Sequence, residues 1–256
     1  MIRIVQIGEN QLNTKRKTSK DSTRKITASN LIRWAGFSAM IAGIFFVLVG
    51  LLHPLNILST VTTTQWAFVH ILATAMGFFG LLGLTGIYAR QVEESGWLGL
   101  VGYILMSLWL VNLSHFTFIE VFVLPPLVTQ APTVVESVLG IFTKSAGEIN
   151  LSALSTIYDL NGFIGYMIGG VLLGIATFRA RVLPRWAGAL LAIGALLVPF
   201  AAVLPPVHEA KVTIPGGLAL VWLGYSLWAE KRQRAVEPVP GRASAGSTQP
   251  EASQVV

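Results

Sequence analysis

Residues 34–53 of the chain read WAGFSAMIAGIFFVLVGLLH, a stretch without a single Asp, Glu, Lys or Arg. A bilayer core about 30 Å thick is crossed by roughly 20 apolar residues in a helix. Hydrocarbon offers no partner to backbone N–H and C=O groups, so a spanning segment of this kind must be helical. The stretch therefore predicts a transmembrane helix.

Five further stretches have the same character, while the whole chain is 53% hydrophobic and only 12% charged. A soluble domain carries about 25% charged residues. We therefore expect an all-α integral membrane protein with six transmembrane helices. Their expected bounds are about 31–53, 66–88, 97–119, 157–178, 186–205 and 212–228.

The basic residues lie almost entirely on one side of these spans. Of the 18 Lys and Arg residues, only Lys144 and Lys211 fall on the side opposite the N-terminus, which we label the outer side. By the positive-inside rule, both termini are expected in the cytoplasm of a multi-pass plasma-membrane protein. The formal net charge of +6 is thus interpreted as a topology signal, with the lipid bilayer as the expected partner and no nucleic acid.

The spans divide the chain into three parts. Residues 1–30 form a basic cytoplasmic tail, residues 31–230 a six-helix transmembrane domain, and residues 231–256 a flexible cytoplasmic tail. No apolar run follows the N-terminal charges until Leu31, so we expect the first span to be a retained helix rather than a signal peptide. The absence of cysteine excludes disulfides, thiolate metal sites and c-type haem.

A short motif recurs at the start of two spans. Arg-Trp-Ala-Gly opens the first span at 33–36 and the fifth at 185–188, and a fainter Trp-Leu-Gly opens the third at 97–99. This pattern predicts three helical hairpins in the same orientation. The alternative is that Trp and Arg recur there because membrane interfaces favour them.

The longest loop, about 120–156, is expected on the outer side. After Pro132, apolar residues such as Val135, Val138, Leu139 and Phe142 recur at helical spacing. The spacing predicts a short amphipathic helix that either lies on the outer surface or covers the bundle as a lid.

Ionisable and polar residues gather at the outer ends of the spans. Ionisable groups within spans are costly and by default suggest function. Four of them form one candidate ligand site with an aromatic residue: His53, His70, His115, Asp159 and Tyr166.

Helical phase separates the members of this site. His53, His70 and Asp159 share faces with glycine and alanine, which mark close helix contacts in membranes. We therefore expect these three side chains to point into the bundle, with Tyr166 on the same face as Asp159. The orientation of His115 stays open. Glu120 and Glu209 map to the same level.

Several chemistries remain compatible with these residues. A small-ligand or proton pocket, for binding or transport, is the preferred interpretation. A membrane-embedded enzyme with zinc, or a b-type haem between His70 and His115, is the alternative. A structural or partner-binding protein without a site is the third. No His-x-x-x-His pair and no Gly-x-Ser-x-Gly elbow occurs, so no catalytic residue, metal or cofactor is assigned.

Overall fold

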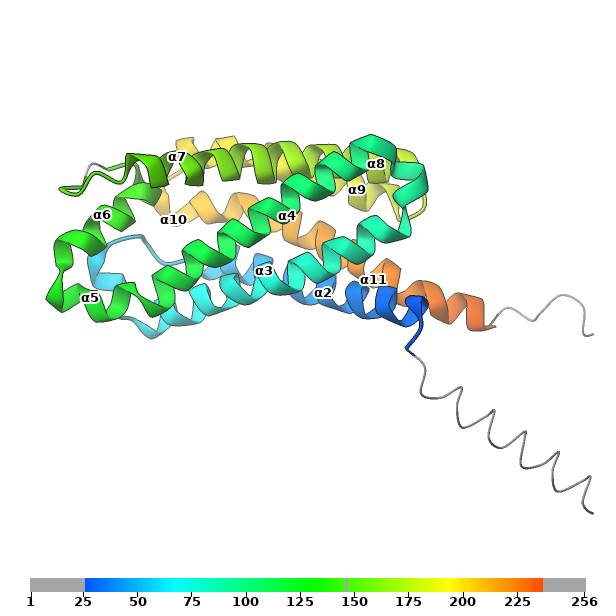
Figure 1. Cartoon of the computed structure of the whole chain (residues 1–256), viewed down its shortest axis with the longest axis horizontal. Helices are drawn as coiled ribbons and strands as arrows, with labels where there is room; N and C mark the ends of the chain where they lie inside the picture. The colour runs from blue at the N-terminus through cyan, green and yellow to red at the C-terminus, as the bar shows by residue number, and fades with distance from the viewer. Residues whose placement is uncertain (1–25, 146, 237–256) are drawn as a thin grey trace, which may run out of the picture.

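Six helices long and apolar enough to cross a membrane run through the computed structural model, which describes residues 26–145 and 147–236. They lie roughly side by side along the long axis of the molecule (Figure 1). We call the end that holds the α5 and α6 helices the outer end. The inner end is the one at which the described chain begins and ends. The two tails expected from the sequence lie mostly outside the described residues.

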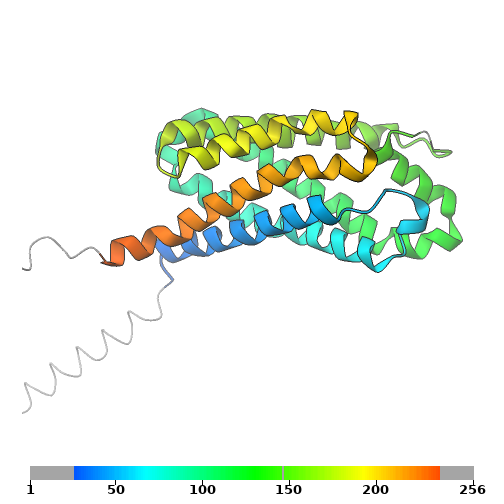
Figure 2. The same ribbon diagram turned by 180° about the vertical axis from the view of Figure 1, so that it is seen from behind.

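The long helices follow one another around a ring in chain order. They are α2 (Ala28–Leu52), α3 (Thr64–Arg90), α4 (Val92–Phe122), the rod Ser152–Ala180, α9 (Arg185–Leu196) and α11 (Ile214–Val236). Each packs against the next, and α11 closes the ring by packing against α2. Figure 2 shows this closing pair, with α11 and α2 side by side at the inner end.

Capping and turn residues set the helix ends. The Thr27 and Thr63 hydroxyls accept hydrogen bonds from Asn30 N and Trp66 N, which caps the first turns of α2 and α3. Gly96, with a φ of 54°, interrupts the start of α4. The straight part of α4 therefore begins at Trp97, where the sequence places the start of the third span.

The fourth span is one rod of three consecutive segments and two helical types. It consists of α7 (Ser152–Leu160), a π-helical segment η2 (Asn161–Ile168) and α8 (Gly169–Ala180). The fifth span was expected as a single helix to residue 205. Instead α9 ends at Leu196 and a 3-10 segment, η3 (Val198–Val203), follows. Pro199 explains this ending, because it lacks the N–H that the α-helical ladder requires.

Short elements form the three connections at the outer end. The α2–α3 connection contains a 3-10 turn, η1 (Leu58–Thr60), and α4 is followed by α5 (Leu124–Gln130) and α6 (Pro132–Thr143). The chain enters α11 through α10 (Pro206–Glu209) and η4 (Ala210–Thr213). The apolar face of α6 is turned toward the bundle, with Val135 and Leu139 buried.

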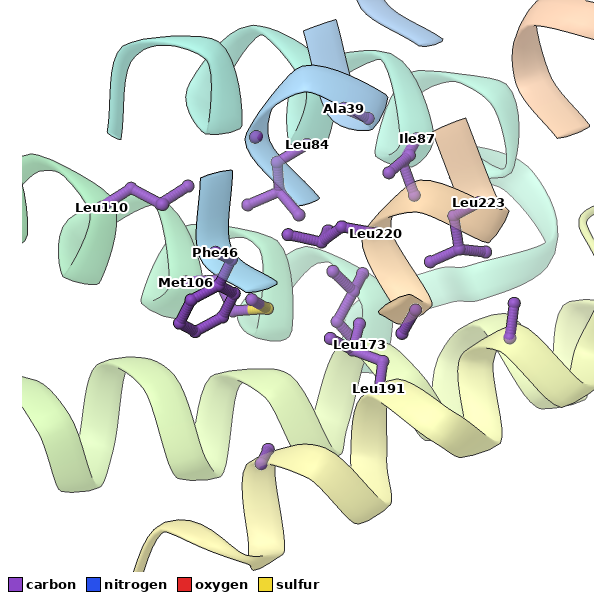
Figure 3. Close-up of a cluster of buried hydrophobic side chains, with 14 of the residues drawn as sticks. Ala39, Phe46, Leu84, Ile87, Met106, Leu110, Leu173, Leu191, Leu220 and Leu223 are labelled. Carbon is purple, nitrogen blue, oxygen red and sulfur yellow. The ribbon is translucent and has the colours of Figure 1, made fainter. Parts of the chain in front are cut away.

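The core runs along the middle of the ring and draws on all six long helices (Figure 3). Among its buried side chains are Phe46, Leu84, Met106, Leu173, Leu191 and Leu223. Lipid tails are as apolar as leucine, so close van der Waals packing, rather than removal from water, holds such helices together. Glycines permit the closest approaches, and these decide how the helices cross.

Two of these glycine crossings are alike atom for atom. A Cβ on Gly36 would meet Gly224 O at 2.8 Å and Trp228 N at 2.8 Å, and a Cβ on Gly188 would meet Gly174 O at 2.7 Å and Phe178 N at 2.9 Å. The preceding arginines match as well. Arg33 lies over the Trp228 ring at 5.2 Å, and Arg185 over the Phe178 ring at 4.3 Å.

Candidate functional site

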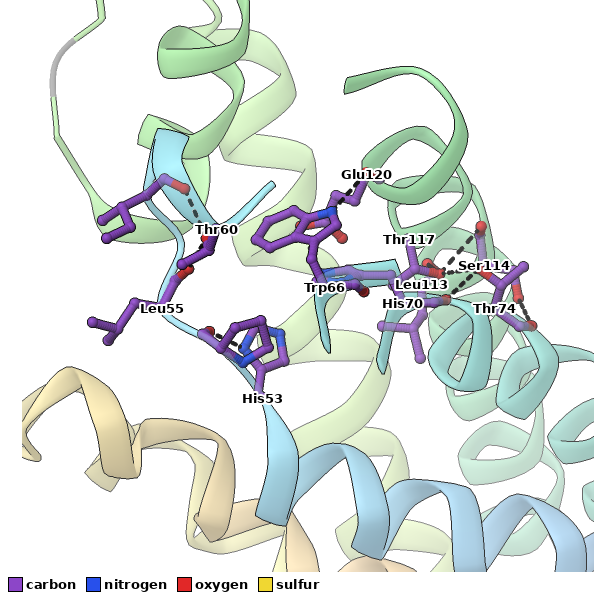
Figure 4. Close-up of polar contacts among 12 residues, drawn as sticks. His53, Leu55, Thr60, Trp66, His70, Thr74, Leu113, Ser114, Thr117 and Glu120 are labelled. Atoms are coloured by element: carbon purple, nitrogen blue, oxygen red, sulfur yellow. Dashed lines mark hydrogen bonds and ion pairs between the residues drawn. The ribbon is translucent and has the colours of Figure 1, made fainter. Parts of the chain in front are cut away.

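At the outer end, three chain segments bring two imidazoles and one carboxyl group together. His53 directly follows α2, His70 lies in the second turn of α3, and Glu120 lies in the last turn of α4 (Figure 4). We call His53, His70, Glu120 and the adjoining Trp66 the outer cluster. It takes in two of the five residues proposed from sequence.

His70 is held in one orientation. Its side chain is 1% exposed, and its ring stacks on Trp66 at a centroid distance of 4.0 Å. Its Nδ1 lies 2.8 Å from Trp66 O. A carbonyl oxygen can only accept a hydrogen bond, so Nδ1 carries the hydrogen and donates it. The second ring nitrogen, Nε2, is then left with a lone pair in the neutral imidazole.

Glu120 faces that lone pair. Its Oε1 lies 3.5 Å from His70 Nε2, and the residue is 5% exposed. Within the described part of the chain, Nε2 has no hydrogen-bond partner. Two acceptors that face each other without water are unfavourable unless a proton lies on one of them. A single proton between Glu120 Oε1 and His70 Nε2 would satisfy both atoms.

Trp66 fixes the distance between the two helices that carry this pair. Its indole Nε1 donates to Glu120 O at 2.8 Å, so the same residue that stacks on His70 also binds the backbone of Glu120. One turn deeper, the Thr74 and Thr117 hydroxyls lie 2.9 Å apart and join α3 to α4 again. These bonds hold the register of α3 against α4 at the level of the cluster.

His53 stands between the buried pair and the outer end of the molecule. Its ring centroid is 5.3 Å from that of His70, and its Nδ1 donates to Pro54 O at 2.7 Å. Burial lowers the pKa of His53 below its ordinary 6.5, and nearby His70 lowers it further, whereas Glu120 and the Pro54 hydrogen bond act to raise it. His53 is half-buried, whereas the neighbouring His70 is buried.

An apolar cap covers the other side of the cluster. Trp66 packs with Val61 of the α2–α3 connection, with Leu124 of α5 and with Val135 and Leu139 of α6. The short helices α5 and α6 thus close the outer end over the carboxyl group. Exclusion of water strengthens every electrostatic interaction inside.

Asp159 and His115 lie elsewhere. Asp159 was expected to point into the bundle, but its side chain is 54% exposed and forms an ion pair with Lys144. His115 is exposed on the outward face of α4, two residues from the inward-facing Thr117. The structure does not bring either residue into the outer cluster.

Tyr166 occupies a separate place in the middle of the bundle. It lies in the π-helical segment, buried against Trp109 and Phe46 at centroid distances of 4.5 and 5.7 Å. Among the described residues its hydroxyl has no hydrogen-bond partner. It belongs to the main core, whereas Trp66 belongs to the smaller outer one.

Glu120 and Trp66 are the members that sequence reasoning left out of the site. Glu120 lies one residue beyond the expected end of the third span at 119, so the sequence does not assign it to a face of that helix. It follows the buried Phe116 and Thr117 by four and three residues, which places it on the same inward face. In the structure α4 continues to Phe122, and a predicted helix of that length would have included Glu120.

The geometry does not support the metal and haem alternatives. Within residues 26–145 and 147–236, no three His, Asp or Glu side chains are grouped to hold one metal ion. A haem between His70 and His115 would need both rings to face one space, but one is buried inside the bundle and the other is exposed on its outside.

Comparison with protein-family models, with curated proteins and with solved structures finds no match to this chain. No family is therefore assigned. What supports a function is the outer cluster itself.

Proposed function

We propose that this is a multi-pass plasma-membrane protein that binds a proton at an outward-facing cluster of His53, His70 and Glu120. The observation that carries the proposal is the 3.5 Å approach of Glu120 Oε1 to the otherwise unpartnered His70 Nε2, in a site almost closed to solvent. A small ligand is the broader class to which the site was assigned from sequence. The His70 ring stacks on Trp66 at 4.0 Å, so one face of the imidazole is already covered. We therefore propose the smallest ligand, a proton.

The proposed orientation rests on charge. All but two of the basic residues lie on the side of the N-terminus, and the positive-inside rule then places both termini in the cytoplasm. The outer cluster would face the exterior. His53 would be the group through which a proton reaches His70 from that side.

We also propose that the bundle is built from three hairpins in the same orientation. The matched crossings at Gly36 and Gly188 support the relation of the first hairpin to the third. The middle hairpin has a weaker likeness, since Gly99 lies against Ser95 of its own helix and only loosely against Ala176.

Binding, rather than passage through the membrane, is the function that the surroundings favour. Below the cluster the described core is filled by apolar and aromatic side chains, among them Phe46, Met76 and Trp109. A proton carrier uses chains of ionisable groups. A protein whose outer end responds to external pH needs only the cluster and the helices that it joins.

The four histidines allow a direct test, because ¹⁵N-histidine NMR of the protein in micelles gives one set of signals for each. Glu120→Gln keeps the size of the side chain and removes its charge. We expect it to lower the pKa of His53, because the carboxylate no longer stabilises the imidazolium, and to shift the ring ¹⁵N signals of His70, which lies 3.5 Å from the substituted side chain. The signals of His115 and His208 should stay where they are in the unmodified protein.

Asp159→Asn is the matched control, since it removes a carboxylate from the same end of the molecule at an exposed position. It should leave the His53 and His70 signals unchanged. If Glu120→Gln moves neither signal, or if Asp159→Asn moves them equally, the outer cluster is not the proton site.

A further inference from the structure

A cavity opens at the inner end, far along the bundle from the outer cluster. It has a volume of about 580 Å³ and lies between the turn that joins α8 to α9 and the last turns of α11. Figure 2 shows α11 in orange running past that turn. The volume is within the range of about 300–1,000 Å³ that small-molecule sites occupy. Its charged lining residues are Arg181, Arg185 and Glu230.

The carboxylate in this lining is already paired with an arginine outside the cavity. Glu230 binds Arg90 of α3 through two hydrogen bonds from Arg90 Nε, at 2.8 and 3.0 Å, and a third from Nη2. Arg90 itself is not part of the lining. The cavity therefore keeps the positive charge of its two arginines.

Neither of these arginines forms an ion pair with a carboxylate of the described chain. The Arg185 guanidinium lies over the Phe178 ring at 4.3 Å and near Trp186 at 5.3 Å, and its buried Nε–H has no acceptor among the described residues. Stacking holds the guanidinium plane and leaves its N–H edge for an anion. The N–H groups along this edge can donate two parallel hydrogen bonds to the oxygens of a phosphate group.

The second arginine is placed by an unusual backbone. Arg181 ends α8 with a φ of 57°, in the left-handed region where glycine is the usual residue. Its side chain is exposed at the mouth of the cavity. The turn thus presents two arginines four residues apart to one space.

We propose that this cavity binds a phosphate group, held between Arg181 and Arg185. The flanking side chains favour the headgroup of an anionic phospholipid as its source. Tyr225, in the lining, is 56% exposed, and Trp186, which follows Arg185 in the chain, is 63% exposed. Exposed Trp and Tyr at a helix end are typical of the membrane interface, where headgroups lie. Basic pockets between transmembrane helices bind such headgroups.

The test uses the full chain in nanodiscs that contain either phosphatidylglycerol or phosphatidylcholine, followed by native mass spectrometry. We expect retained phosphatidylglycerol on the unmodified protein. Arg181→Gln and Arg185→Gln should each weaken its retention by about tenfold, since each removes a charge-assisted contact. A second measurement adds inorganic phosphate to the detergent-purified protein and follows its melting temperature.

Arg33→Gln is the matched control. Arg33 lies in the second turn of α2, in the same Arg-Trp-Ala-Gly motif, and it lies over an aromatic ring in the same way, but it does not line the cavity. Its variant should bind phosphatidylglycerol like the unmodified protein, which separates the cavity from a general loss of positive charge.

The two measurements distinguish the sources of the phosphate. Phosphatidylglycerol retention without stabilisation by inorganic phosphate supports a lipid headgroup. Stabilisation by inorganic phosphate that both cavity variants abolish supports a soluble phosphate compound. Equal loss in Arg33→Gln, or no difference between the two lipids together with no effect of phosphate, overturns the proposal.

Discussion

Two of the buried polar atoms without a hydrogen-bond partner in the described chain, His70 Nε2 and the Tyr166 hydroxyl, differ in whether a proton could satisfy them. His70 Nε2 faces the carboxyl group of Glu120, so a single proton can satisfy both groups. The Tyr166 hydroxyl faces aromatic rings and the backbone of Gly216. The first arrangement becomes favourable on protonation, whereas the second is an unrelieved cost to the folded state. Only the first therefore suggests a function.

The lowered pKa of His53 predicts how stability depends on pH. Between the lowered folded-state value and the ordinary 6.5, the unfolded chain binds a proton that the folded chain does not. The free energy of unfolding should therefore hold its full value above about pH 6.5 and fall as the pH drops below it. Thermal unfolding in detergent from pH 8 to pH 4.5 measures this loss.

His53→Gln should reduce that loss, because glutamine does not titrate. His115→Gln provides the comparison, since the imidazole that it removes is exposed. An unchanged pH profile in His53→Gln would show that His53 does not contribute to it.

Tyr166→Phe should make the protein more stable by about 1–3 kcal/mol, the cost of a buried hydroxyl without a partner. The same substitution should rescue a second one. A Cβ on Gly216 would overlap the Tyr166 hydroxyl, while the ring carbon behind it lies at an ordinary 3.5 Å. Gly216→Ala should thus destabilise the unmodified protein and cost little in the Tyr166→Phe background. Additive effects in this double-mutant cycle would contradict the assignment.

Among the elements, hydropathy was sufficient to predict the six long helices but not their interruptions. Each expected span has a long apolar helical segment in the structure, with ends that differ by up to six residues, but the fifth reaches Val203 only through the 3-10 segment η3. The π-helical segment at Asn161–Ile168 was not predicted, because hydropathy does not distinguish a π-helical stretch from an α-helical one. A helix with i to i+5 bonds turns through a smaller angle per residue than an α-helix.

That segment also explains why Asp159 was misplaced. Its phase was projected at 100° per residue onto Tyr166 and Gly169, across residues that are in fact π-helical. The difference in angle per residue adds up along the segment, so Asp159 lies on a different face from Tyr166 and is exposed. His70 lies in an uninterrupted α-helix, and there the same reasoning placed the side chain in the bundle.

The glycine crossings predict a matched pair of destabilising substitutions. Gly36→Ala and Gly188→Ala each place a methyl group within 2.9 Å of backbone atoms on the facing helix. Overpacking of this kind costs about 1–3 kcal/mol. Because the two sites have the same geometry, we expect similar falls in melting temperature in detergent.

Gly162→Ala is the control for these variants, since a Cβ there has nothing within 4 Å. It should leave the melting temperature unchanged or slightly higher. A large effect at only one of Gly36 and Gly188 would count against the proposed relation between the first and third hairpins.

At the scale of the whole molecule, the ring of helices and the distribution of charge make one prediction together. An even number of spans would place the two ends of the described chain on one side of the membrane, and the positive-inside rule predicts that this side is the cytoplasm. The chain has no cysteine, so a single introduced thiol reports its own location. Glu148→Cys lies beyond α6 at the outer end, and Glu94→Cys lies at the inner start of α4; both positions are exposed.

A membrane-impermeant maleimide added to intact cells should label Glu148→Cys and not Glu94→Cys, which should react only after permeabilisation. The unmodified chain should give no signal under either condition. Labelling of Glu94→Cys alone in intact cells would show that the protein has the opposite orientation, with the His53–His70–Glu120 cluster facing the cytoplasm. The cluster would then respond to the pH of the cell interior, and the arginine cavity would meet the outer leaflet instead of the inner one.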